Sequence, residues 1–531
     1  MRKFGKQLLA GPYLVWIIGF IILPVFAVLY YALTNSAGSF TMENIAAIAE
    51  PVHLKALFLA LKLAVICTLI CLLLSYPLAM ILNNMKIKEH SFVVFLFVLP
   101  MWMNFMLRIL AWQMLLSNNG IINSLLKTLG FSGINLMNTP TAVVFGMVYD
   151  YLPFMILPIY NALVRIRKDL IEAARDLGAG NLLVFFKIIL PLSLSGVFSG
   201  IIMVFVPALT SFVISDLLGG GKVLLIGNVI EQSFMQGMDW HLGSGLSIVL
   251  MIFVIASMAF MNRRKLRRKC RMVKKGIERL YLIIIFLFLY LPIVVLIVLS
   301  FNDSKSRVQW GGFTLRWYQE VFKSRTIMNA FYTTITITLV ASIVATLLGT
   351  LAAIGIHSMK RRQKALMLGA TNIPLLNADI VTGISLMLLL IKFTRLGMNT
   401  VLIAHITFNI PYVILNVLPK LNSLSPNTYE AALDLGASRP YAFWKIIWPD
   451  IKGGVFSGFL MSVTMSLDDF SITYFTKGPG VNTLSTMIYT ELKKGIKPEM
   501  YALSTILFLI ALLLLLLMNY RSSKKSTALT T

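Results

Sequence analysis

The chain is dominated by apolar runs, each long enough to cross a lipid bilayer as a helix. A transmembrane α-helix needs about 20 consecutive, mostly apolar residues. The sequence contains twelve such runs, approximately at residues 13–33, 56–82, 91–115, 140–163, 194–214, 244–261, 280–300, 330–356, 366–391, 398–418, 454–475 and 500–519. We therefore predict an all-α polytopic membrane protein with about twelve transmembrane helices.

Composition excludes the main alternatives to a membrane protein. Of the 531 residues, 58% are hydrophobic and 13% are charged, whereas soluble domains contain about 25% charged residues. A disordered chain and a disulfide-stapled secreted chain are excluded, because the apolar content is too high and the cysteines are too few. The three cysteines, Cys67, Cys71 and Cys270, cannot supply the four thiolates of a metal centre, and we predict no metal site.

The basic residues predict which side of the membrane each loop occupies. The net charge of +26 is spread between the apolar runs rather than over one face of a soluble domain, so nucleic acid is not an expected partner. Residues 263–279 hold ten basic residues and one acid, Glu278. Because cytoplasmic loops carry the excess of Lys and Arg, this connector and both termini are predicted to be cytoplasmic. Residues 476–499 are then external, although they contain four lysines that the sequence does not explain.

The chain contains a repeat of half its length. Residues 172–191 align with residues 430–449 at an offset of 258 positions, with 12 identities in 20. Six apolar runs in each half give both halves the same orientation in the bilayer, so the repeat is parallel. We predict two domains, residues 1–272 with spans one to six and residues 273–531 with spans seven to twelve.

The repeated segment is a cytoplasmic loop between the fourth and fifth runs of each half. Residues 168–177 form an amphipathic helix by pattern, Gly178 permits a turn, and residues 181–190 resume a helix. Two copies at equivalent positions predict two docking points for a two-fold partner, although an interfacial helix that only completes a loop is the alternative. The residues shared by the two copies include Glu172, Ala173, Ala174 and Gly178 in the first and Glu430, Ala431, Ala432 and Gly436 in the second.

The two halves differ in charge along the fifth run. Asp468 and Asp469 stand where the first half has Thr210 and Ser211. A charge at the middle of a bilayer costs about 2.5–3.5 kcal/mol, so acids there usually face a cavity or a partner. On a continuous helix the two carboxylates point about 100° apart. Both can border one aqueous path only if the polar stripe along the helix is wide or if the helix is locally unwound. The alternative is a solvated pair at the membrane edge.

Other residues complete a predicted path for an organic cation. Ser466 lies on the same helical stripe as Asp469, and Asp379 lies near the middle of the ninth run. Aromatic faces attract cations, so we add Trp102, Trp317 and Tyr474 to the candidate lining. Each aromatic residue taken alone also fits the belt that marks a membrane interface.

The repeated motif Glu-Ala-Ala-x-x-x-Gly, followed by Ile-x-x-Pro, resembles the signature loop of permease subunits of bacterial ATP-binding-cassette importers. The first half, with Leu99–Trp102 and Asp216–Lys222, is similar to the B-type permease of spermidine/putrescine importers. The second half, with Ala404–Phe408 and Ser466–Phe470, is similar to the C-type permease, although Ala378 stands before Asp379 where that pattern usually has Pro. The resemblance implies a type I importer permease fold with both permeases fused.

The resemblance also implies partners and a location. Two copies of a cytoplasmic ATPase would dock at the two loops, and an extracytoplasmic polyamine-binding protein would deliver the polyamine at the bacterial inner membrane. Gly219–Lys222 lacks both the spacing and the hydroxyl of a phosphate-binding loop. We therefore expect no enzyme activity and no cofactor in this chain, with ATP and Mg²⁺ on the partner ATPase.

Three alternatives stay open at this point. A fused permease of the same family can carry another substrate, such as ferric iron, thiamine or an aminophosphonate. An ion-driven secondary transporter also uses parallel six-span repeats, but it has no need of the duplicated loop. An intramembrane aspartyl enzyme needs two acids facing each other from separate spans, as Asp379 and Asp469 could.

Overall fold

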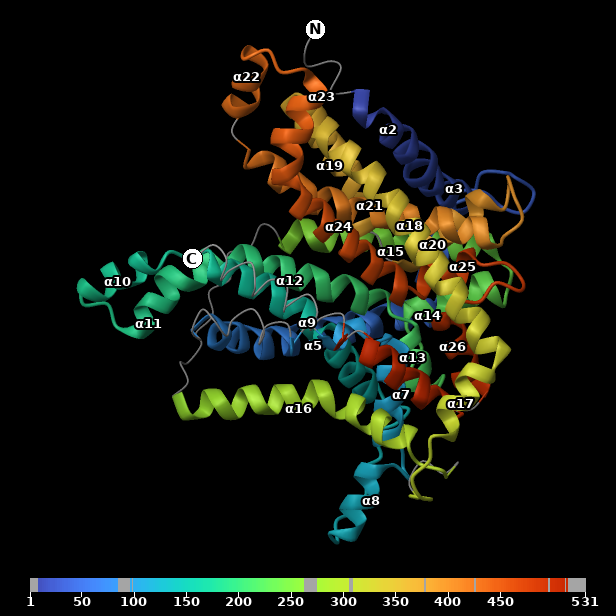
Figure 1. The fold of residues 1–531 in the computed structure, drawn as a ribbon. Coiled ribbons are helices and arrows are strands. Elements are labelled where there is room, and N and C mark those ends of the chain that lie inside the picture. Colours follow the sequence, from blue (N-terminus) through green and yellow to red (C-terminus); the bar gives the residue numbers. More distant parts are fainter. Residues whose placement is uncertain are drawn as a thin grey trace. The chain divides into compact units, whose positions relative to one another are not determined.

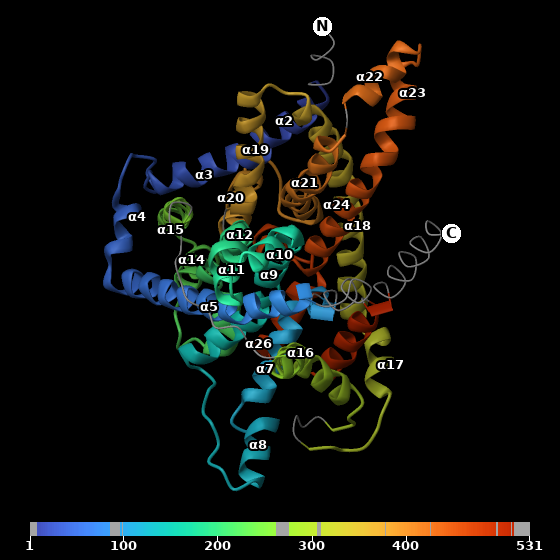
Figure 2. The same cartoon turned by 90° about the vertical axis from the view of Figure 1, so that its left-hand side faces the viewer.

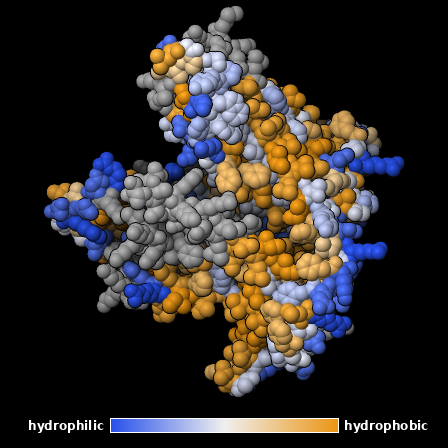
Figure 3. All heavy atoms as spheres, viewed as in Figure 1, coloured by the Kyte–Doolittle hydropathy of each residue, from blue (hydrophilic) through white to orange (hydrophobic). Residues whose placement is uncertain are grey.

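The computed structural model describes residues 8–84, 96–97, 99–261, 275–304, 309–376, 379–424, 426–494, 497–510 and 512–513. Within these ranges the chain forms helices, and no β-strand apart from two isolated bridges (Figure 1). Wide areas of the surface are apolar (Figure 3), and large side chains such as Leu73 on one helix and Leu347 on another are exposed. Apolar exposure on this scale suits helices that face lipid.

Eight helices in the described ranges are long and apolar enough to cross a membrane. They are Gly11–Ala32, Pro51–Asn84, Pro140–Val164, Asn181–Thr210, Trp240–Ser257, Glu278–Ser300, Arg325–His357 and Met398–Asn422. The ninth predicted run forms a pair of helices, Arg361–Pro374 and Asp379–Leu390, bent by 95°. The third and twelfth runs lie partly outside the described residues, as does Ala378. The predicted fold class, an all-α polytopic membrane protein, is confirmed.

The half-length repeat is present in the order of the helices. Pairs of helices that begin 258 positions apart include α9 (Pro140–Val164) with α21 (Met398–Asn422), α12 (Leu190–Thr210) with α24 (Trp448–Asp468), and α13 (Val213–Gly219) with α25 (Ser471–Thr476). Two earlier pairs begin 274 positions apart (325 − 51 and 379 − 105), namely α5 (Pro51–Asn84) with α18 (Arg325–His357), and α7 (Phe105–Leu116) with α20 (Asp379–Leu390). The additional residues of the first half lie between α7 and α9, around α8 (Ile121–Thr128).

The described chain divides into two compact units that do not coincide with the halves of the repeat. The first unit contains residues 1–47, 239–251 and 325–487, and the second contains residues 48–238, 252–324 and 488–531. In the first unit α18 packs against α21 and α24, and in the second unit α9 packs against α5 and α12. The division at residues 272 and 273 describes the repeat in the sequence and stays a prediction.

Glycines at equivalent positions let the fifth span of each half approach the fourth span closely. A Cβ atom on Gly196 of α12 would stand 2.4 Å from the carbonyl oxygen of Pro158 on α9. One on Gly454 of α24 would stand 2.8 Å from the carbonyl oxygen of Asn416 on α21. Such small residues permit close helix packing in membranes. The glycines of the repeated sequence therefore preserve the same helix pair in both units.

Candidate functional site

The fifth span of the second half is interrupted at the two acids. Helix α24 ends at Asp468, Asp469 has extended backbone (φ −61°, ψ 132°), and α25 begins at Ser471. The first half breaks at the equivalent place, where α12 ends at Thr210 and Ser211 has φ −64° and ψ 122°. Since both halves break there, the interruption belongs to the shared scaffold, and the charges are an addition in one half.

The carboxylate of Asp469 caps the short helix that follows the break. Its Oδ1 accepts a hydrogen bond from the backbone N–H of Ile472 at 3.3 Å, and its Oδ2 accepts from the backbone N–H of Thr473 at 2.8 Å. The Thr473 hydroxyl also donates to Oδ2, at 2.7 Å. A broken helix inside a membrane leaves backbone donors without partners, and an acid at the helix N-terminus satisfies them while the helix dipole stabilises its charge.

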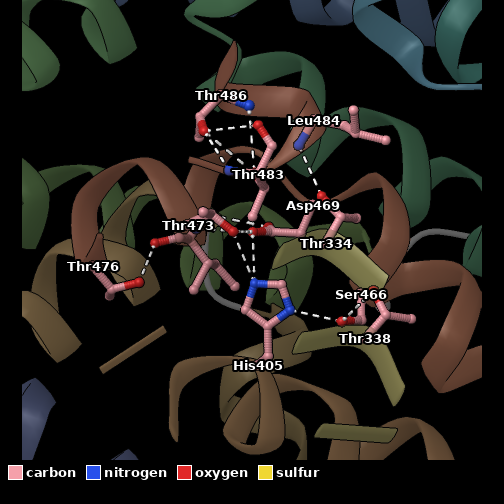
Figure 4. A network of polar contacts seen from close by, with 11 residues as sticks. Thr334, Thr338, His405, Ser466, Asp469, Thr473, Thr476, Thr483, Leu484 and Thr486 are labelled. Carbon is pink, nitrogen blue, oxygen red and sulfur yellow. Dashed lines mark hydrogen bonds and ion pairs between the residues drawn. The ribbon is translucent and has the colours of Figure 1, made fainter. Parts of the chain in front are cut away.

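His405 of α21 joins this capped helix to α24. Its Nε2 lies 2.8 Å from Thr473 Oγ1 and 3.4 Å from Asp469 Oδ2, and its Nδ1 lies 2.7 Å from Ser466 Oγ (Figure 4). Ser466 in turn lies 3.4 Å from the hydroxyl of Thr338 on α18. Sequence reasoning named His405 only as part of a family motif. The signal that could have found it is an ionisable residue within an apolar run.

Hydroxyl groups from three further segments hold the surroundings of the break. Thr334 Oγ1 on α18 accepts from the backbone N–H of Leu484 at 2.8 Å, and the Thr400 hydroxyl on α21 donates to the carbonyl oxygen of Thr476 at 2.8 Å. Thr483 and the neighbouring Thr486 hydrogen-bond to each other at the start of α26 (Leu484–Lys494) (Figure 4). The end of α25 is thereby tied to α21, and the start of α26 is tied to α18.

Asp379 lies in the same compact unit as the two acids of the break. It lies in the first turn of α20, the second helix of the bent ninth span, and its side chain is exposed. Helix α20 packs against α25, and Asp379, Asp469 and the Tyr412 hydroxyl are close enough to interact electrostatically. The structure thus brings together two candidate acids from separate helices, each at a helix N-terminus where the dipole favours an anion.

The three candidate aromatic residues have different settings. Tyr474 of α25 is half-buried, with its ring 5.0 Å from that of Phe470 beside the acids. Trp317 of α17 (Arg316–Lys323) belongs to the other compact unit, where it is buried and donates from its indole nitrogen to the carbonyl oxygen of Asn302 at 2.8 Å. The side chain of Trp102 lies outside the described residues. A role in the path stays a prediction for Trp317 and Trp102.

The two repeated loops form equivalent elbows. Helices α10 (Lys168–Asp176) and α11 (Asn181–Val184) make the first elbow, and α22 (Pro426–Asp434) and α23 (Arg439–Ala442) make the second. Each pair projects beyond the spans that it connects in Figure 1, and Figure 2 shows the projection of α22 and α23 from a second side. The expected helix, corner and helix is therefore present in both halves.

The corner of each elbow is a left-handed glycine. Gly178 has φ +80° and Gly436 has φ +85°, a conformation that side chains with a Cβ atom rarely adopt. The same backbone hydrogen bond closes both corners. The N–H of Ala179 donates to the carbonyl oxygen of Ala174 at 3.0 Å, and the N–H of Ala437 donates to the carbonyl oxygen of Ala432 at 3.0 Å. Such caps end a helix sharply and satisfy its last carbonyl groups.

The elbows present the same side chains to solvent. Glu172 and Glu430 are exposed, and the residues before the corner glycines, Leu177 and Leu435, are 88% and 89% exposed. A single π-helical turn then leads into each fifth span, at Phe185–Ile189 and at Phe443–Ile447. The proline that follows each turn, Pro191 or Pro449, has no N–H to continue the α-helical pattern, which accounts for the wider turn.

Two of the four lysines in residues 476–499 form ion pairs in the structure. Lys493 of α26 forms an ion pair with Asp216 at 2.9 Å, and Lys497 forms one with Glu491 at 3.2 Å. Partial burial lowers the pKa of Lys477 below its ordinary value. Lysines that form ion pairs are weak indicators of the side of the membrane on which a loop lies.

No group of three or more His, Cys, Asp or Glu side chains that could hold a metal ion occurs in the described part of the chain. Cys67 and Cys71 are buried and free there. Small buried thiols of this kind pack as apolar residues.

Comparison with known proteins gives matches to both halves. A family model described as "Binding-protein-dependent transport system inner membrane component" matches residues 64–271 and again residues 345–522. The spermidine/putrescine transport system permease protein PotB of Haemophilus influenzae is 39% identical over 247 residues, which cover 45% of this chain and 86% of that protein. PotC of the same organism is 35% identical over 232 residues, covering 44% of this chain and 90% of that protein.

Relatives from a second organism and one solved structure are also similar. PotB of Escherichia coli is 40% identical over 245 residues, covering 45% of this chain and 89% of that protein. The crystal structure of a bacterial alginate ABC transporter, in complex with a periplasmic protein bound to an alginate pentasaccharide, matches with a TM-score of 0.42 and 15% identity. The match covers 47% of this chain and 90% of that one.

Proposed function

The chain belongs to the family of binding-protein-dependent transport system inner membrane components, and from this premise we propose that it is the fused permease of an ATP-driven importer of polyamines. B-type and C-type relatives match its two halves, as the sequence resemblance predicted. The names of those relatives support a substrate of the spermidine or putrescine class. The chain is thus a multi-pass permease of the bacterial inner membrane.

The observation that carries the choice of a cationic substrate is the acid cluster of the second half. Asp379 and Asp469 occupy helix N-termini, and Asp468 adjoins the break. The helix dipole favours the ionised carboxylate of Asp469, which is 9% exposed, and a low-dielectric surrounding strengthens its attraction for ammonium groups. Ammonium–carboxylate hydrogen bonds are among the strong polar contacts in proteins. In this proposal Asp468, Asp469 and Asp379 attract the polyamine, with Ser466 and Tyr474 nearby.

The elbows are the proposed attachment points for two ATPase subunits. Equivalent elbows in a parallel repeat suit two copies of one partner, and each elbow offers an exposed leucine and an exposed glutamate. ATP and Mg²⁺ belong to that partner. An extracytoplasmic polyamine-binding protein delivers the substrate on the opposite side of the membrane, and both termini are cytoplasmic.

Each elbow transmits the motion of its ATPase to the fifth span through short, rigid elements. A closed helix corner and one π-helical turn connect each elbow to the fifth span, which carries the break. When the ATPases close around ATP, the elbows move with them and the membrane spans open the substrate path to one side of the membrane and then to the other.

Uptake of radiolabelled solutes tests this function. The chain is expressed with its ATPase and binding protein in cells that lack other polyamine importers. We expect saturable uptake of spermidine or putrescine, inhibition by unlabelled polyamine, and loss of uptake when ATP is depleted. Uptake of ferric iron, thiamine or an aminophosphonate in place of polyamine would contradict the proposed substrate. Uptake that follows a proton gradient after ATP depletion would contradict the proposed energy source.

A further inference from the structure

His405 contacts both helices that meet at the break of the second half. Its Nδ1 lies 2.7 Å from Ser466 Oγ on α24, and its Nε2 lies 2.8 Å from Thr473 Oγ1 on α25 (Figure 4). The imidazole is 1% exposed, so water does not compete for these contacts. One side chain of α21 therefore fastens the two helices on either side of the break.

The direction of the hydrogen bonds places a proton on Nε2. An ionised carboxylate only accepts hydrogen bonds, so the Thr473 hydroxyl donates to Asp469 Oδ2, at 2.7 Å. The oxygen of that hydroxyl then faces His405 Nε2 as an acceptor, and Nε2 must carry the hydrogen. The Ser466 hydroxyl can turn toward Nδ1 or toward Thr338. His405 is thus a donor to the Thr473–Asp469 pair whether its ring is neutral or charged.

These contacts restrict the acids at the break. Asp469 uses Oδ1 for the Ile472 N–H and Oδ2 for Thr473, and His405 stands 3.4 Å from that same Oδ2. Asp468 is the neighbouring residue in the chain, so the fixed backbone of Asp469 also limits where the carboxylate of Asp468 can lie. The donor on α21 therefore helps to fix the carboxylate of Asp469 beside Asp468.

The first half shows what the same scaffold looks like without this arrangement. At the positions equivalent to His405, Ser466 and Asp469 it has Met147, Ala208 and Ser211. Its fifth span breaks nevertheless. The histidine is not needed to break the helix, and it occurs in the half that carries the acids.

We propose that His405 is a positioning residue for transport. It does not touch the cation, but holds Asp469, Thr473 and Ser466 in the geometry that binds it. This inference rests on the proposed function, because it assumes that the acids at the break contact the polyamine. It assigns to a buried histidine the task of keeping the carboxylates in the geometry that binds the substrate.

The test measures the KM and the maximal rate of spermidine uptake in variants at two ends of the same contact. His405→Met installs the residue of the other half, and Thr473→Val removes the hydroxyl with little change of shape. We expect each to raise the KM about tenfold, which is the effect of losing a hydrogen bond to a charged group, while ATPase attachment stays intact. His405→Gln, whose amide can reach the position of Nε2, should recover most of the loss.

Thr407→Val is the matched control. Thr407 is as buried as His405 on the same helix, but its hydroxyl does not face the acids. It donates a hydrogen bond to the carbonyl oxygen of Ile403 and accepts one from the indole N–H of Trp16. We expect its KM to stay within about twofold of the wild-type value. In the double variant of His405→Met and Thr473→Val, the two losses should not add, because both remove one contact.

Several outcomes would overturn the inference. An unchanged KM in Thr473→Val would do so even if His405→Met failed to reach the membrane. So would additive losses in the double variant, or a KM increase in Thr407→Val equal to that in His405→Met. These outcomes differ from a failure of the proposed function, which would appear as absence of spermidine uptake by the wild-type chain.

Discussion

The broken fifth spans of the two halves have the same backbone and different chemistry. Both helices end at equivalent residues, Thr210 and Asp468, and both resume within three residues. The side chains at and around the break differ, and beside Thr210 and Asp468 the differences include Met147, Ala208, Ser211 and Ser215 in the first half against His405, Ser466, Asp469 and Thr473 in the second. The comparison indicates that the scaffold supplies the break, and that one half has been supplied with acids and with the donors that hold them.

The first half has buried charges of its own, at other positions of the scaffold. Arg108 of α7 and Asp150 of α9 form an ion pair at 2.8 Å, with side chains that are 3% and 9% exposed. The equivalent positions in the second half hold Thr382 and Phe408. Arg108 and Asp150 neutralise each other, whereas the described part of the second half places Asp468, Asp469 and His405 at its break. We expect an organic cation to be attracted to the break of the second half.

The largest effect on stability is expected at this ion pair, which the equivalent positions of the second half lack. Arg108→Leu should destabilise the fold by about 3–5 kcal/mol, because Asp150 would lose its buried positive neighbour. The measurement is the thermal unfolding of the detergent-solubilised importer. Thr382→Val, at the equivalent position of the second half, should cost less than about 1 kcal/mol.

The double variant of Arg108→Leu and Asp150→Leu distinguishes the effect of an unpaired buried charge from the effect of altered side-chain packing. It should recover most of the stability, since two apolar side chains can replace a buried pair. A double variant as unstable as Arg108→Leu would contradict this account of the pair.

The elbows should behave alike, in contrast to the breaks. Glu172→Lys and Glu430→Lys each reverse an exposed charge on one elbow, and each should reduce the co-purified ATPase to about half, because one of two docking points is lost. The double variant should retain little ATPase. Glu320→Lys, the same change on α17, is the control. Co-purification at the wild-type yield in the double variant would refute the docking role.

A smaller effect is expected from the corner glycines. Gly178→Ala or Gly436→Ala should cost about 1–2 kcal/mol in the left-handed conformation, and so weaken ATPase attachment by about tenfold. Asn at either position should be milder, because Asn adopts this conformation more readily. Gly453→Ala is the control, since no atom stands near its Cβ position and its φ is not positive. Equal effects of Gly453→Ala and Gly178→Ala would contradict the argument.

Much of the fold was predictable, because bilayer thickness fixes the length of a span and the repeat fixes the order of spans. The elbows were predictable from Gly178 and its repeat at Gly436. The sequence did not reveal that Asp469 caps α25 or that His405 joins the two helices, since both depend on contacts between residues distant in the chain. Likewise the burial of Trp317 against Asn302 is a local packing feature that an aromatic pattern does not show.

We propose above all that the carboxylates at the break of the second half, Asp468 and Asp469, attract the cation as it crosses the membrane. The most direct measurement is ATP-driven spermidine uptake into proteoliposomes by the double variant Asp468→Asn and Asp469→Asn, beside Thr210→Val and Ser211→Ala at the equivalent break. The account predicts that uptake is abolished in the first double variant and retained in the second, with both assembled in the membrane. Wild-type uptake by the variant without the two carboxylates would contradict it.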